Sequence, residues 1–136
     1  MLPRLVLAAF LVGHAAVHAG YLSPRPAPTL GGPAWPFTLA HSWILSPLGV
    51  GADTLRILGY SLFALILASF ALAAIAAVGF QPAGVWGWST VVGAAGSLAM
   101  LVLFFHPYLA VGVAIDLLAL WTVLILGWTP TDTPTT

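Results

Sequence analysis

The sequence contains no cysteine, no lysine and no glutamate, and its formal charges come from three arginines and three aspartates. Without cysteine there can be no thiolate metal ligand, no disulfide exchange and no cysteine nucleophile. With so few basic residues the chain cannot neutralise the phosphates of a nucleic acid, so no nucleic-acid partner is expected. The HExxH and GxSxG motifs are also absent, which argues against a zinc protease and a serine hydrolase. These absences favour a protein that is not an enzyme.

Hydrophobic residues make up 61% of the chain and give it a mean hydropathy of +1.09. Such a composition is typical of an integral membrane protein, which is surrounded by the lipid bilayer. Four windows reach the roughly twenty apolar residues that a membrane span needs. They lie at about 5–22, 53–80, 85–105 and 107–128. The sequence therefore predicts an all-α fold, a four-transmembrane-helix bundle that forms one domain over residues 1–129, followed by a disordered polar tail at 130–136.

A long connection joins the first two windows and covers residues 23–52. Closely spaced prolines keep its first half, SPRPAPTLGGPAWP, from forming a helix. Its second half is apolar but too short to span a membrane. We therefore expect a short interfacial or re-entrant helix at about 38–45, with Trp35 and Trp43 at the depth of the lipid headgroups.

The other two connections are short, so the second, third and fourth windows are expected to be antiparallel neighbours. Gly93 and Ser97, four residues apart, are interpreted as packing residues that let these helices approach closely. Four spans place both termini on one side, with the long loop and the turn FHPY on the other, which we call the loop face. Arg4 belongs to the side of the termini, and Arg25 and Arg56 belong to the loop face. This distribution is too even to determine the orientation of the chain.

The stretch GHAAVHAG carries two histidines inside an apolar window. His14 and His18 are one helical turn apart, so they share a helix face with Tyr21. At a rise of about 1.5 Å per residue, His14 lies ~12 Å inside the loop face and Asp116 lies ~13 Å inside it. An aspartate near the middle of a span costs about 2.5–3.5 kcal/mol, so Asp116 is expected to have a partner. The candidate partners are His14, His18 and Arg56.

Two uses of this cluster involve a bound cofactor. One is a metal site, in which histidines and a carboxylate bind iron, zinc or manganese, or a haem site with a histidine as axial ligand. The other is a pocket for a quinone-like ligand, whose carbonyl group would bind a tyrosine or a histidine. The candidate metal ligands are His14, His18, Asp116 and His106, and the candidate residues for an organic cofactor are His14, His18, Tyr21 and His41.

Two further uses need no cofactor. A buried polar network can fix the register of the helices, as in a purely structural subunit of a membrane complex. Titratable groups inside the membrane also suit a proton-coupled transporter, which at this size would act as a homo-oligomer. The sequence thus predicts a small membrane binding or accessory subunit, associated with itself or with other membrane subunits, and leaves these alternatives open.

The first window has a second interpretation as a cleaved signal peptide of residues 1–19, because the small-residue pattern VHA precedes Gly20. His14 would then lie in the apolar core of the signal, and the apolar stretch continues to Leu22. Both features favour a retained first helix.

Overall fold

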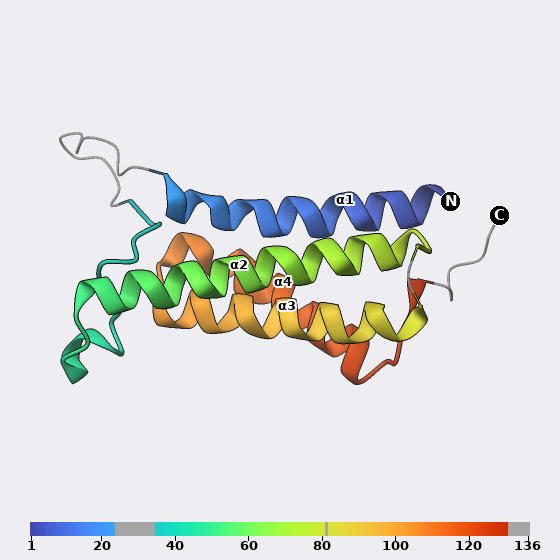
Figure 1. Cartoon of the computed structure of the whole chain (residues 1–136). Helices are drawn as coiled ribbons and strands as arrows, with labels where there is room; N and C mark the ends of the chain where they lie inside the picture. The colour runs from blue at the N-terminus through green and yellow to red at the C-terminus, as the bar shows by residue number, and fades with distance from the viewer. Residues whose placement is uncertain (24–34, 81, 131–136) are drawn as a thin grey trace.

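The chain folds as a bundle of helices (Figure 1), which a computed structural model describes over residues 1–23, 35–80 and 82–130. Within these ranges four helical segments are long and apolar enough to cross a membrane, and there is no strand. This confirms the all-α, four-span fold. The elements are α1 (Leu2–Val17), η1 (His18–Leu22), η2 (Ser46–Leu48), α2 (Ala52–Ala77), α3 (Ala83–Leu103), η3 (Pro107–Leu109) and α4 (Ala110–Leu124).

Two helices end a few residues before the apolar windows do, and each time a glycine in the left-handed region follows. Helix α2 ends at Ala77, and Gly79 has a φ of 94°. The amide of Phe80 then bonds to the carbonyl of Ile75 at 3.3 Å. Helix α4 ends at Leu124, and Gly127 has a φ of 61°. A left-handed glycine closes the last helical turn without steric cost, so the apolar windows extend beyond the helices.

The helices pack in chain order, α1 against α2, α2 against α3 and α3 against α4. Figure 1 shows α2 between α1 and α3. At the centre, the ring of Phe70 on α2 lies against Gly93 on α3, where an added Cβ would come within 3.2 Å of the ring. Helices α1 and α4 are not a closely packed pair. The two ends of the described chain meet at one end of the bundle, where the Arg4 Nε atom donates to the carbonyl of Pro130 at 3.1 Å.

The structure of the loop before α2 differs from the helix expected at about 38–45. A helix over 38–45 is not clearly formed, because this segment consists of bends and turns and is followed by the short 3-10 turn η2. Side chains fix it instead. The Ser42 hydroxyl donates to the carbonyl of Leu103, and the Trp43 indole donates to the carbonyl of Val102, each at 2.6 Å. The carbonyls at the end of α3 lack partners within their own helix, so they hold the loop in this irregular path.

Two glycines let the loop approach the helices closely. A Cβ at Gly59 on α2 would lie 2.5 Å from the Leu39 side chain, and a Cβ at Gly20 would lie 2.8 Å from the ring of Phe37. The loop residues Phe37 and Leu39 therefore cover the loop end of the bundle. The proline-rich residues 24–34 with Arg25, and tail residues 131–136, lie outside the described residues.

We predict that Gly59→Ala is less stable than Gly13→Ala. Both substitutions sit in helices and gain the same helix propensity, about 1 kcal/mol. Nothing lies within 4 Å of a Cβ at Gly13, whereas a Cβ at Gly59 meets Leu39. Overpacking typically costs about 1–3 kcal/mol. Thermal unfolding in mild detergent measures the difference in stability between the two variants. Equal melting temperatures would contradict the close contact between Leu39 and Gly59.

Candidate functional site

A buried hydrogen bond joins the first and last helices. The Nε2 atom of His14 on α1 lies 2.8 Å from Oδ1 of Asp116 on α4. The Asp116 side chain is completely buried and that of His14 is nearly so. The ring of His14 also packs edge-on against Phe70, with 5.4 Å between the centroids. The expectation that Asp116 has a partner at its own depth is therefore confirmed, and that partner is His14.

A serine on α3 completes the surroundings of Asp116. The Ser97 hydroxyl oxygen is hydrogen-bonded to Oδ2 of Asp116 at 2.5 Å and lies 3.0 Å from Nε2 of His18. Ser97 is fully buried. The four-residue spacing from Gly93 predicts only a packing role for this serine. Its position, about as deep in the bilayer as Asp116 on the neighbouring antiparallel helix, is the signal that could have found it.

The network of His14, His18, Ser97 and Asp116 has a simple proton balance. The Nδ1 atom of His18 lies 3.4 Å from the carbonyl oxygen of His14, which can only accept, so Nδ1 carries a hydrogen in this contact. Two hydrogen arrangements with no net charge satisfy all four contacts. Either His18 is an imidazolium and Asp116 a carboxylate, or both are neutral and the Asp116 carboxyl group donates to Ser97. The arrangements differ by one proton, which the Ser97 hydroxyl can pass between His18 and Asp116.

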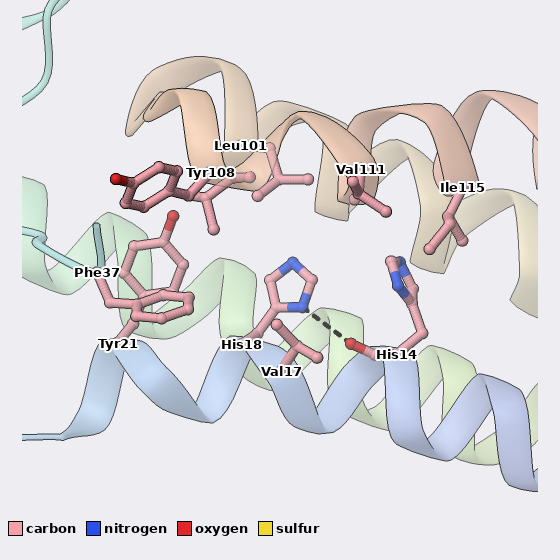
Figure 2. A pocket seen from close by; sticks show the side chains of 11 residues that line it. His14, Val17, His18, Tyr21, Phe37, Leu101, Tyr108, Val111 and Ile115 are labelled. Carbon is pink, nitrogen blue, oxygen red and sulfur yellow. Dashed lines mark hydrogen bonds between the residues drawn. The ribbon is translucent and has the colours of Figure 1, made fainter. Parts of the chain in front are cut away.

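Beside this network lies a cavity of about 160 Å³ between α1 and α4. Figure 2 shows His14, His18 and Tyr21 projecting from the first helix toward the helix that carries Val111 and Ile115. Phe37 from the loop and Tyr108 from η3 line its end near the loop face. The lining is mostly apolar, with polar groups on the side of α1. We call this space the α1–α4 cavity.

The hydroxyl of Tyr21 has no hydrogen-bond partner among the described residues. The residue is buried, and among the described residues nothing accepts from or donates to this oxygen. The Tyr21 ring is held edge-on against Phe37, with 5.2 Å between the centroids. In Figure 2 its hydroxyl points away from the first helix, toward Tyr108. A buried hydroxyl without a partner costs about 1–3 kcal/mol, so this group is available to a ligand in the cavity.

Three residues expected near the site lie elsewhere. Arg56 is not a partner of Asp116, because its Nη1 atom donates to Oδ1 of Asp53 at 2.8 Å on the exposed surface. Arg56 stands in the second turn of α2, from which its long side chain reaches outward. His41 and His106 line a separate small pocket near the loop face.

The histidines of the network are not arranged as the predicted metal or haem site requires. In the described part of the chain, no three or more His, Cys, Asp or Glu side chains form a group that could hold a metal ion. The Nε2 atoms of His14 and His18 face different partners, Asp116 and Ser97, and not a common point. A cavity of about 160 Å³ is also smaller than the ~300 Å³ at which pockets for whole drug-sized ligands typically begin. A haem macrocycle does not fit such a space.

Comparison of the chain with protein families, with curated proteins and with solved structures gives no match. Four candidate membrane-spanning helices fit a multi-pass membrane protein. Its class is thus defined by its own fold and site: a helical membrane bundle with a buried histidine, serine and aspartate network beside a small cavity.

We predict that Ser97→Ala lowers the free energy of unfolding by about 1–2 kcal/mol, the range that model peptides give for hydrogen bonds between membrane helices. The substitution removes the contacts to Asp116 and His18 and leaves Oδ2 of Asp116 without its hydrogen-bond partner. Ser89→Ala is the matched control, because Ser89 is buried on the same helix but donates only to carbonyls of that helix, those of Val85 and Trp86. Such bonds add little to helix stability. Equal losses for both variants, measured by unfolding in detergent, would refute a stabilising role for the network.

Proposed function

We propose that the protein is a small integral membrane binding protein, without enzymatic activity of its own, that takes the ring of a quinone-like lipophilic carbonyl compound into the α1–α4 cavity. In this proposal the termini lie on one side of the membrane and the cavity opens in the half of the bilayer near the loop face. The observation that carries the proposal is the buried Tyr21 hydroxyl, which has no partner among the described residues.

The polar groups that line the cavity favour a ligand that carries a hydrogen-bond acceptor. His14 and His18 already bond to Asp116 and Ser97 through Nε2. Tyr21 therefore offers a buried donor that no described residue uses, and a phenol donates well to a carbonyl oxygen. Small-molecule sites are typically apolar with a few polar groups that orient the ligand, and the lining of this cavity follows that pattern.

The position of the cavity favours a ligand that enters from lipid. Val17 and Val111 stand at its edge and are more than half exposed, at 56% and 70%. The exposed surface of a span faces hydrocarbon, so a lipophilic molecule can reach the cavity sideways between α1 and α4. The volume of about 160 Å³ suits one ring, with any long tail remaining in the bilayer.

A proton-coupled transporter acting as a homo-oligomer is the second candidate. The observation that favours it is the path from His18, which lines the cavity, through the Ser97 hydroxyl to Asp116. One proton can move along this path without a change in net charge. As a purely structural subunit, the protein would keep the same network but would have no use for the free Tyr21 hydroxyl.

We predict that Tyr21→Phe weakens the binding of a short-tailed benzoquinone about tenfold, the effect of one lost hydrogen bond of roughly 1.4 kcal/mol. The melting temperature of this variant should equal or exceed that of the unchanged protein, because the hydroxyl bonds to no described residue. Titration calorimetry of the protein in mild detergent measures the affinity. Tyr60→Phe, on the exposed surface of α2 and away from the cavity, is the control and should bind normally.

Two results would contradict this function. The first is unchanged benzoquinone affinity in Tyr21→Phe, which would remove the role of the hydroxyl. The second is a drop in melting temperature together with the loss of affinity, which would make Tyr21 a structural residue.

A further inference from the structure

We propose that Trp35, His41 and His106 form a second site, which binds the oxyanion of a phosphate group at the loop face. These residues line a pocket of about 80 Å³, beside the end of α3. Thr38 and Trp43 also line it, and none of these residues lines the α1–α4 cavity. The site is therefore separate from the one proposed for the lipophilic ligand.

The hydrogen-bonding pattern of His106 makes it a donor toward the pocket. Its Nδ1 atom accepts from the backbone amide of Tyr108 at 3.3 Å. A neutral imidazole whose Nδ1 accepts must carry its hydrogen on Nε2.

Two further lining residues offer hydrogens. The indole nitrogen of Trp35 is buried, and no described residue accepts its hydrogen. Thr38 accepts from the amide of Ala40 at 3.4 Å, which leaves its hydroxyl hydrogen free to donate. His41 is exposed and adds an imidazole ring, whose N–H group can donate. The pocket thus gathers donors of several kinds.

Two backbone acceptors near the pocket are already in use. The carbonyls of Val102 and Leu103, at the end of α3, accept from the side chains of Trp43 and Ser42. These bonds also compensate part of the negative end of the α3 dipole, which would otherwise repel an anion. The described carboxylates, Asp53 and Asp116, do not line the pocket. A ligand must therefore bring the acceptors, as a phosphate does with several oxygens.

Size and position narrow the ligand to a single small group. A water molecule takes about 30 Å³ of liquid volume, so about 80 Å³ holds a group of a few heavy atoms and not a whole lipid headgroup. Trp43 and Phe105 line the same pocket and are exposed, at 59% and 49%. Exposed aromatic side chains at the end of a span are typical of headgroup depth. At this depth the phosphate comes either from a phospholipid diester or from free phosphate in solution.

The test uses the full chain, delipidated in mild detergent, and measures the binding of inorganic phosphate by titration calorimetry. We expect binding to the unchanged protein, and at least tenfold weaker binding to Trp35→Phe and to His106→Gln. Trp88→Phe is the matched control, because Trp88 is exposed on α3 and does not line this pocket. It should bind phosphate normally. His41→Gln, which changes an exposed side chain, provides a third test if either of the other two variants fails to fold.

A competition arm identifies the source of the phosphate. If added phosphatidylglycerol micelles displace inorganic phosphate, the site takes a lipid diester. If they do not, it takes free phosphate, and both results support the proposal. Absence of binding of both probes to the unchanged protein would overturn it, as would equal affinity in all variants. The benzoquinone titration of Tyr21→Phe is independent, so failure of one site is distinguishable from failure of the other.

Discussion

The buried carboxyl group of Asp116 is the constraint on which the arrangement of the bundle depends. A polar group at this depth must be bonded, because lipid offers it no partner. His14 supplies one bond from α1 and Ser97 supplies another from α3, while Asp116 itself stands on α4. Three helices are thus fixed in depth and rotation relative to one carboxyl group. Helix α2 contributes packing, because the ring of Phe70 lies against His14 on α1 and against Gly93 on α3.

Composition was enough to predict the four spans, and the depth of the polar residues left three candidate partners for Asp116, of which His14 is one. Each span had to be a run of apolar residues, and counting the helical rise placed His14 and Asp116 at the same level, where they meet. Depth alone misjudged Arg56, because a long side chain near a helix end can turn outward and pair with Asp53. Ser97 was not predicted as a member of the network, because its side chain is small. A small residue in an apolar helix serves close packing and hydrogen bonding equally well, and only the neighbouring helix decides between them.

The loop and the two pockets lay beyond what the sequence could give. Whether residues 38–45 form a helix depends on the free carbonyls at the end of α3, which bond to Ser42 and Trp43. Those bonds connect residues about sixty positions apart, so no local pattern contains them. The same holds for the cavity beside Tyr21, which exists because α1 and α4 do not pack closely. The local sequence determines the spans. The path of the loop and the two pockets depend on how the helices pack against one another.

The packing of the helices in chain order also has a consequence for how the protein is made. Because neighbours in sequence are neighbours in space, α1, α2 and α3 can assemble as they leave the ribosome, before α4 exists. At that stage His14, His18 and Ser97 face a space that the carboxyl group of Asp116 will fill. Helix α4, which is synthesised after the other three, therefore completes the polar network. A chain cut short before Asp116 would leave these imidazoles in hydrocarbon without that carboxyl group.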